Sequence, residues 1–474
     1  MSAATILKSR PAIILALCAV PAFSLAQVAG VLPGSTPTPA RAAPQDAGLV
    51  VTLGYQTSLR AGDNLGNTGA ANKNSYIFDN TLSLGVKSTT RDTSFSLDTS
   101  GILRTSNATG TRQGALDNQT IKFSYSHSSA NSKLTLDGSY NSASMAFLDP
   151  LLLSDLSGSD LIPSNARRNY LAGGVTFETG IDGPLGLQFQ ARRQAVQYSG
   201  TLSPGLYDWA HNQFALDLRA QVGTATQSHL LANEDTYSAN DAAQTTHRID
   251  TLRFGVTHDI DAVTQLSVTL GAGRLTTGGL LATPVQNAGV GSLDLNRTLA
   301  NGGAGLSFDR SLDINGPRST LRAGRNYDFA DGAFNVSLGA TQGTRGGGKA
   351  IGGLTLKRTT TSGQIDLSLS RDISQSASVN EELVNRATLT YARPLTKTSS
   401  LALSLEYALA EDAGYNTVTT HRWSGARATF SQNLTPDWAL TTGYQYVHNN
   451  SGSTGAANSN SVFITLGRTF TFRP

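Results

Sequence analysis

The residues best suited to catalysis or metal binding are scattered along the chain. No HExxH sequence and no Cys/His spacing occurs, and Asp208 and His211 are close to each other but have no nucleophile tied to them by spacing. Ser and Thr are so frequent that a Ser–His pair is expected by chance, and there is no GxSxG sequence. The histidines are His127, His211, His229, His247, His258, His421 and His448. We therefore expect no catalytic residues, no bound metal and no cofactor, and hence no enzyme.

Charged and amide side chains follow a regular pattern instead. Leu185, Leu187 and Phe189 alternate with Gln188, Gln190 and Arg192. The same alternation of apolar and polar residues occurs around Asp217, Arg219 and Arg253. A period of two residues indicates a strand with one apolar and one polar face. The candidate pore-lining residues are Arg192, Arg219, Arg253, Asp217, Gln188 and Gln190.

The polar face of these strands must contact water. An Arg or Lys facing lipid at mid-bilayer costs about 2–4 kcal/mol, whereas the same residue facing a water-filled lumen costs little. We therefore expect a channel-like interior. The alternative is that these arginines are solvated wall residues balanced by Asp217 and neighbouring acids.

Strands of about ten residues repeat along the chain from Leu49 onward, which is the length that spans a bilayer when tilted. Short turns such as Lys87–Thr93 and Ser128–Ser132 alternate with longer connections such as Ala61–Asn74. This pattern predicts an all-β, closed antiparallel transmembrane barrel of 18–22 strands, with 20 as the best prediction. The ambiguity lies in residues 289–364, where the strands pair in two possible registers.

The N-terminal residues resemble a secretory signal peptide. Lys8 and Arg10 precede an apolar stretch that ends in Ser24-Leu25-Ala26, a small-residue cleavage site. We expect residues 1–26 to be a signal peptide, 27–48 a flexible periplasmic lead-in and 49–474 the barrel. Cleavage would remove Cys18, which is the single cysteine, so neither disulfides nor thiol-bound metals are expected. The near balance of basic and acidic residues argues against a nucleic-acid partner.

The C-terminal strand carries the most specific motif. Val462, Ile464, Leu466, Phe470 and Phe472 share one face of it. The order of Gly467, Phe470 and Phe472 resembles the C-terminal assembly signal of Gram-negative outer-membrane β-barrels, from which the appended Arg473-Pro474 departs. The resemblance implies a porin-like protein of the cell outer membrane, with membrane lipid and the barrel assembly machinery as partners and a homo-oligomer as a possibility.

The longest predicted loop, Ser142–Ala166, has an apolar centre followed by acidic residues. An exposed loop of this kind would form a sticky surface, which folding into the barrel would remove. Its acids Asp149, Asp155 and Asp160 would then oppose the wall arginines and form a constriction, by analogy with general porins. A lid helix, or an apolar surface for a partner or for lipid headgroups, is the alternative.

We therefore predict a channel for passive diffusion of small hydrophilic solutes. An outer-membrane barrel for exopolysaccharide export or secretion is the second hypothesis. A cell-surface adhesin or structural β protein is the third, although the fixed short repeat that a β-solenoid requires is not found.

Overall fold

Twenty-two strands make up almost the whole computed structural model, which describes residues 48–67, 74–108, 113–153, 161, 164–200, 206–280, 282–344, 347–374, 381–413, 420–450 and 455–473. The first half comprises β1 (Gly48–Asp63), β2 (Ser75–Thr89), β3 (Thr93–Ser106), β4 (Gln113–Ser128), β5 (Ser132–Ser144), β6 (Arg167–Thr179), β7 (Leu185–Ser199), β8 (Trp209–Gly223), β9 (Thr226–Ala239), β10 (Thr246–Asp259) and β11 (Thr264–Gly278). The second half comprises β12 (Gln286–Leu299), β13 (Gly302–Asp313), β14 (Gly316–Phe329), β15 (Gly332–Gln342), β16 (Lys349–Thr360), β17 (Gly363–Ser374), β18 (Glu382–Pro394), β19 (Ser399–Asp412), β20 (Thr420–Asn433), β21 (Trp438–Asn450) and β22 (Ala456–Phe472). The predicted signal peptide and nearly all of the lead-in lie outside the described residues.

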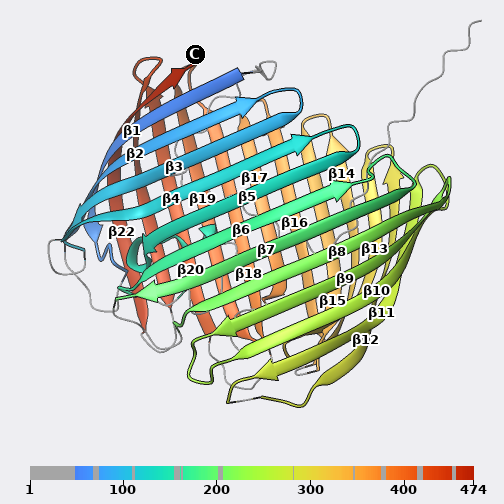
Figure 1. Cartoon of the computed structure of the whole chain (residues 1–474). Helices are drawn as coiled ribbons and strands as arrows, with labels where there is room; N and C mark the ends of the chain where they lie inside the picture. Colours follow the sequence, from blue (N-terminus) through green and yellow to red (C-terminus); the bar gives the residue numbers. More distant parts are fainter. Residues whose placement is uncertain are drawn as a thin grey trace, which may run out of the picture.

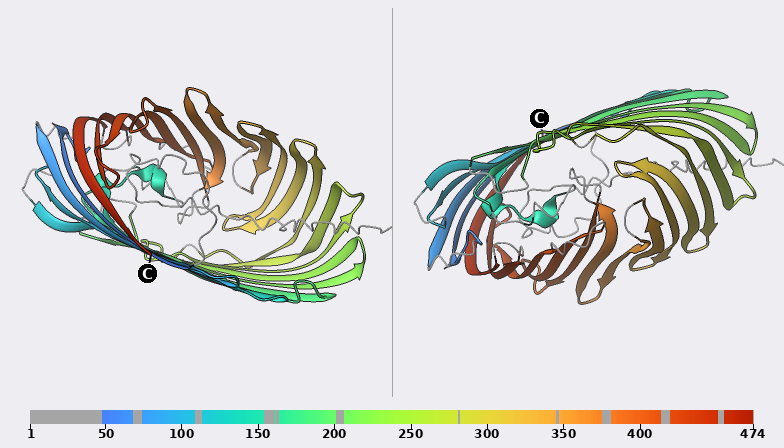
Figure 2. Two further views of the ribbon diagram at one scale, coloured as in Figure 1. Left: turned by 90° about the horizontal axis from the view of Figure 1, so that it is seen from above. Right: turned by 90° about the horizontal axis from the view of Figure 1, so that it is seen from below.

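The strands close into one antiparallel barrel (Figure 1). Each strand pairs with the next, and β22 pairs with β1 from Val51–Phe472 to Asp63–Asn460. Seen along its axis, the barrel is an elongated ring rather than a circle (Figure 2). The predicted all-β closed barrel is confirmed.

Two more strands occur than the best prediction of 20, although 22 lies within the predicted range. The difference arises in the ambiguous region, where connections of two residues follow β12, β13, β14 and β16. Gly302 and Gly316 begin the strands after two of these turns with φ of 121° and 114°, a backbone that glycine adopts without strain. Because a turn of two residues gives little signal in a sequence, the boundaries between these strands do not follow from the sequence alone.

The strands are also longer than predicted, at 11–17 residues instead of about ten. About ten residues cross the hydrocarbon layer, so the remainder of each strand extends the barrel beyond it. The even strand number places both ends of the barrel on the rim that carries the short turns.

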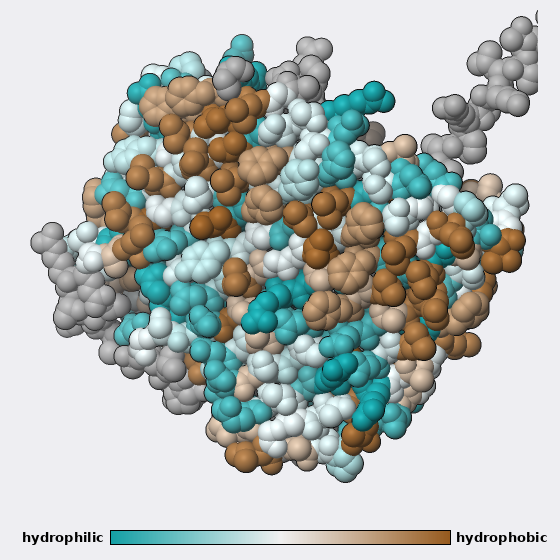
Figure 3. Space-filling model, viewed as in Figure 1, coloured by the Kyte–Doolittle hydropathy of each residue, from teal (hydrophilic) through white to brown (hydrophobic). Residues whose placement is uncertain are grey.

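The outer face of the barrel carries an apolar belt. Leu185, Leu270 and Leu338 each expose about 70% of their surface, and further large apolar side chains lie exposed around the ring. In Figure 3 the apolar side chains gather in the upper half of the view and on its right side, and the lower half is more polar. Because exposed apolar surface of this extent is unfavourable in water, the belt is suited to contact with lipid.

Aromatic residues near the strand ends do not all face lipid. Tyr407, Tyr444 and Tyr446 share the outward parity of their strands, as an interfacial girdle requires. Trp209 instead faces inward, where its ring lies 6.1 Å from that of Tyr237. Trp209 is the first residue of β8, so the alternation of polar and apolar residues that assigns the two faces of a strand does not extend to it on both sides.

Among the described residues, no helix is long and apolar enough to cross a membrane.

The seam between β1 and β22 yields a first prediction. A Cβ on Gly62 would overlap the carbonyl oxygen of Asn460, so Gly62→Ala should force the closing strands apart and destabilise the barrel by about 1–3 kcal/mol. Unfolding of the refolded barrel in urea would measure this loss. Gly467→Ala is the matched control, because its Cβ would lie 3.8 Å from its nearest neighbours across the same seam. Equal stability of the two variants would contradict the prediction.

Candidate functional site: the lumen

The connection between β5 and β6 is described at residues 145–153, 161 and 164–166, and we call these described residues the inner segment. They contain two short 3₁₀ helices, Met145–Phe147 and Pro150–Leu152. Figure 2 shows these helices inside the ring of strands in both end-on views. The inner segment therefore occupies part of the lumen instead of extending from the rim.

The inner segment docks on the far wall through apolar contacts. Leu153 and Leu161 expose only 5% and 1% of their surface and pack in one cluster with Val384, Ala408 and Trp423. These wall residues belong to β18, β19 and β20. Burial of two leucines favours docking by about 1.5–3 kcal/mol each.

Two hydrogen bonds add to this docking. Arg386 Nη1 donates to the carbonyl of Leu153 at 3.2 Å, and Asn449 Nδ2 donates to the carbonyl of Leu161 at 2.8 Å. Both donors use backbone carbonyls that would otherwise be buried without a partner. The inner segment is thus fixed at two points of the β18–β21 wall.

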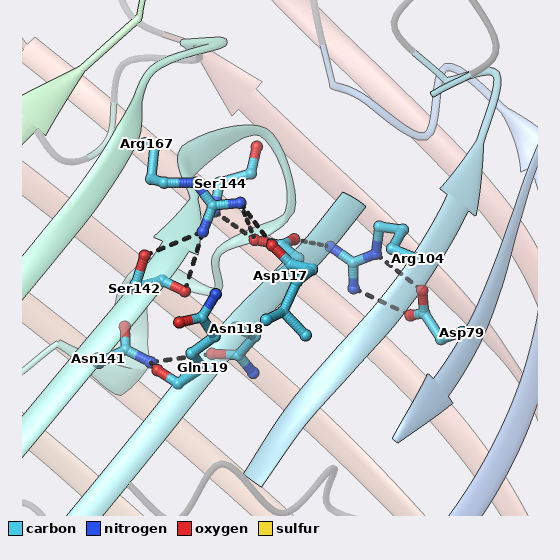
Figure 4. A network of polar contacts seen from close by, with 10 residues as sticks. Asp79, Arg104, Asp117, Asn118, Gln119, Asn141, Ser142, Ser144 and Arg167 are labelled. Atoms are coloured by element: carbon cyan, nitrogen blue, oxygen red, sulfur yellow. Dashed lines mark hydrogen bonds and ion pairs between the residues drawn. The ribbon is translucent and has the colours of Figure 1, made fainter. Parts of the chain in front are cut away.

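The root of the inner segment is held by a buried polar network (Figure 4). The carboxylate of Asp117 accepts hydrogen bonds from Arg104 Nη1 at 2.5 Å, from the backbone N–H of Ser144 at 2.8 Å and from Arg167 Nη2 at 3.3 Å. Arg104 also donates to both carboxylate oxygens of Asp79, at 2.8 and 2.9 Å. Alternating charges thereby link β2, β3, β4 and β6 at the point where the segment leaves β5.

A β-bulge positions Asp117 for this task. Ile102 pairs with Asp117 and Ser100 with Thr120, so β4 contains one residue more than β3 between these pairs. Asn118 adopts a positive φ of 42°, and its side-chain oxygen accepts a hydrogen bond from Asn141 Nδ2 at 2.9 Å. Bulges of this kind re-aim a side chain locally.

Phe147, the last residue of the first 3₁₀ helix, also contacts this network. The guanidinium carbon of Arg104 lies 4.5 Å from the centre of the Phe147 ring, and Phe147 packs against Leu65 and Ile77. A cation over an aromatic face is attractive. Arg104 therefore both balances the carboxylates and positions the aromatic ring at the start of the segment.

The six candidate pore-lining residues lie on the inward parity of β7, β8 and β10. Arg192 Nη2 lies 3.4 Å from Asp137 Oδ2, and Arg219 Nη2 lies 2.5 Å from Glu178 Oε1. Gln188 stands opposite Asp217 in the ladder, and Gln190 opposite Ala215. Asp217 also lies 3.2 Å from His229 Nδ1. Arg192 and Arg219 thus each form an ion pair with an acid on the same wall of the barrel.

Arg253 differs from the other two arginines. The Nε atoms of all three arginines are buried without a hydrogen-bond partner, but in the part of the chain that the structure describes Arg253 forms no ion pair with an acid, unlike Arg192 and Arg219. Gly271, which stands opposite Arg253 on β11, leaves room for the arginine side chain, because a Cβ at Gly271 would lie 2.8 Å from Cγ of Arg253.

Asp149 is the one acid of the predicted constriction, among Asp149, Asp155 and Asp160, that lies in the described residues. Asp149 interacts with Glu406 and Arg427 of the β19–β20 wall and caps the second 3₁₀ helix by accepting from the Leu151 N–H at 3.0 Å. These contacts place Asp149 on the wall where the apolar residues around it dock, whereas Arg192, Arg219 and Arg253 belong to β7, β8 and β10. Asp155 and Asp160 lie outside the described residues.

Sequence reasoning missed the docking surface and the Asp117 network. A signal for the docking surface was present, since Val384, Ala408 and Trp423 occupy inward positions that are polar elsewhere. No sequence signal marks the bulge that brings Asp117 to Arg104 and Arg167.

Protonation of Asp149 should tighten docking of the inner segment. Burial raises the pKa of this carboxyl, so the docked state holds the proton more firmly than a free segment does. Docking is then favoured as the pH falls through the raised pKa and weakened as the pH rises above it. We expect channel conductance to decrease on acidification, and Asp149→Asn to flatten that part of the pH profile. If the Asp149→Asn variant keeps the wild-type profile, the assignment is contradicted.

The seam holds the residues of the proposed assembly signal. Phe470 and Phe472 face outward opposite Leu53 and Val51, and Gly467 stands opposite Gln56. Arg468 lies over the rings of Phe470 and Trp438, at 4.2 and 5.4 Å.

Comparisons with known proteins bear on the fold only. No protein-family model and no curated protein matches the chain. Among solved structures, the FrpB iron transporter from Neisseria meningitidis (F5-1 variant) matches with a TM-score of 0.55 at 9% identity, covering 90% of this chain and 83% of that one. The ferric-catecholate import receptor Fiu from E. coli K12 matches with a TM-score of 0.53 at 10% identity, covering 90% and 82%.

A mutant of the ferric enterobactin receptor PfeA from Pseudomonas aeruginosa, in complex with enterobactin, matches with a TM-score of 0.51 at 10% identity, covering 90% of this chain and 82% of that one. The chain thus shares its fold, a closed barrel of 22 strands, with these solved structures. The predicted outer-membrane β-barrel is confirmed in its architecture.

Proposed function

We propose that this barrel is an outer-membrane channel through which small hydrophilic solutes diffuse, narrowed by the inner segment. The observation that carries the proposal is the one-sided docking of the segment. It packs on the β18–β21 wall, while the inner faces of β12–β17 keep exposed polar side chains such as Asn296, Asn326 and Asn335. Water and small solutes would pass along this uncovered wall.

Conductance of the purified barrel in a planar bilayer tests the proposal. A passive channel gives steady current without any other component, and current is absent if the lumen is closed. Because acids accompany the wall arginines, we expect weak ion selectivity in the wild-type channel.

Selectivity provides a sharper prediction. Arg192→Gln leaves Asp137, with 38% of its side chain exposed, without its cation in the lumen. The permeability of K⁺ relative to Cl⁻ should then rise about two-fold, because an unpaired fixed charge attracts counter-ions. Reversal potentials across a salt gradient measure this ratio. Arg358→Gln is the control, since Arg358 pairs with Asp331 on the outer face and its loss should leave the ratio unchanged.

A gated exporter, for an exopolysaccharide or another secreted polymer, is the second candidate. Its support is the combination of apolar contacts and two hydrogen bonds that holds the inner segment in the lumen. Conductance that appears only after the segment is removed would favour the exporter. The β-solenoid form of the third hypothesis is wrong, because the strands close into a barrel.

Iron uptake is not part of the proposal. The similar structures are siderophore receptors and an iron transporter, but the feature that this chain shares with them is the barrel itself. Membrane lipid around the apolar belt and the barrel assembly machinery at the last strand are the partners that we propose.

A further inference from the structure

A trough crosses the inner faces of β13–β17, on the wall that the inner segment leaves uncovered. A cavity of about 620 Å³ lies here. Its hollow comes from one ladder row, in which Gly305 pairs with Gly324, Gly324 with Ser337 and Ser337 with Gly353. Glycine and serine leave space that larger side chains would fill.

The adjacent row supplies hydrogen-bonding groups. Asn326 pairs with Asn335, Asn335 with Thr355 and Thr355 with Ser368, so amides and hydroxyls stand side by side on four successive strands. Asn326, Asn335 and Ser368 are exposed to the lumen. Asn335 Nδ2 donates to Thr355 Oγ1 at 3.0 Å, which leaves its other amide donor and its carbonyl oxygen for a ligand.

The lining includes Arg297 and Arg325, which stand on the outward parity of β12 and β14, and inward-facing charges lie at the flanks of the trough. On one side Arg322 Nη2 lies 2.6 Å from Asp372 Oδ2, and this ion pair reaches from β14 to β17 over Gly339. On the other side Lys357 stands directly opposite Asp366. Arg322 and Lys357 thus each have a neighbour of opposite sign, and the inward-facing side chains within the trough itself are uncharged.

The shape of the trough suits a chain rather than a single small molecule. Five adjacent strands spaced about 4.8 Å apart give it a length of about 19 Å. Because barrel strands tilt by about 35–45°, a row that crosses them also runs obliquely along the axis of the lumen. A linear molecule bound here would therefore be aligned partly with the direction of transport.

We propose that the trough binds an uncharged, hydroxyl-rich chain, namely an oligosaccharide, during its passage. Hydroxyl groups both donate and accept, which matches the mixture of amides, hydroxyls and glycine backbone. The inference rests on the proposed transport function and names the class of solute for it.

Channel block by a neutral, linear gluco-oligosaccharide in a planar bilayer is the first test. The saccharide should interrupt the wild-type current reversibly, and a polyethylene glycol of the same size should do so far less. Gly324→Val and Gly353→Val would fill the trough, and their Cβ atoms meet neighbours only at ordinary distances of 3.5 Å. We expect each to weaken the block about 10-fold, comparable with loss of one or two good hydrogen bonds.

Two controls separate binding from narrowing. Asn326→Ala with Asn335→Ala should weaken the block about as much while enlarging the lumen. Ser124 lies on the inner face of β4 and outside the trough, so Ser124→Val should leave the block by the saccharide unchanged. Equal block by saccharide and polyethylene glycol, or block that survives all trough variants, would overturn the inference.

Failure of the channel proposal would be recognised separately. If the purified barrel carries no current, calorimetric titration of the detergent-solubilised protein with the same oligosaccharide still tests the trough. Binding that the Gly324→Val change weakens about 10-fold supports the proposal, and absence of heat with the wild type, or equal affinity of the two proteins, rejects it.

Discussion

Replacing Leu161 by Asp should open the channel. Leu161 exposes 1% of its surface and contacts the apolar cluster of the β18–β21 wall, where an unpaired carboxylate would cost several kcal/mol. The backbone connects the inner segment to the barrel only through β5 and β6. The segment can therefore undock and expose the carboxylate to water while the barrel stays folded. Single-channel conductance should rise about two-fold or more, as the lumen of so wide a barrel is otherwise open to water.

A change on the wall tests the same contact from the other side. Trp423→Ala removes the largest side chain of the docking surface and should also raise the conductance. The double variant should conduct no better than Leu161→Asp alone, because an undocked segment no longer contacts Trp423. Additive increases would indicate that the two residues act independently.

The added charge needs its own control. Ser124→Asp places a carboxylate on the inner face of β4, where Ser124 is exposed and away from the docking cluster. It should change ion selectivity without raising conductance. If Ser124→Asp raises conductance as much as Leu161→Asp does, the effect is electrostatic and undocking is not its cause.

The barrel was predictable because the alternation of polar and apolar residues within each strand identifies its two faces. Leu185, Leu187 and Phe189 are apolar and their neighbours polar whatever lies elsewhere in the chain, so lipid and water faces follow from local sequence. Closure followed similarly from the last strand, whose outward residues Phe470 and Phe472 now lie beside β1. The exact strand number was less accessible, because two-residue turns carry little signal.

The arrangement inside the lumen was less predictable. The leucines of Ser142–Ala166 made an inward fold one of the alternatives, but the wall that the inner segment contacts depends on Val384, Ala408 and Trp423, which lie on three other strands. Placement of Asp149 beside Glu406 is a consequence of that contact. Trough formation likewise depends on the register of five strands, which brings Asn326 and Asn335 together only in the closed sheet.

Loss of the Asp117 carboxylate should destabilise the barrel more than loss of any exposed ion pair. The side chain of Asp117 is 4% exposed, and it separates the guanidinium groups of Arg104 and Arg167. Asp117→Ala leaves these cations without their shared partner and leaves the Ser144 N–H without an acceptor. A broken buried pair costs about 3–5 kcal/mol. Urea unfolding of the refolded barrel should show this loss.

A matched control distinguishes burial from charge. Asp331→Ala also removes an acid from an Arg partner, 3.1 Å from Arg358 Nε, but 43% of the Asp331 side chain is exposed. We expect that change to cost less than about 1 kcal/mol, as is usual for surface pairs. Asp117→Ala should in addition release the root of the inner segment, so its current should fluctuate where that of Asp331→Ala stays steady. Equal losses of stability in the two variants would mean that the network is no stronger than a surface pair, and that the contacts on the β18–β21 wall hold the segment instead.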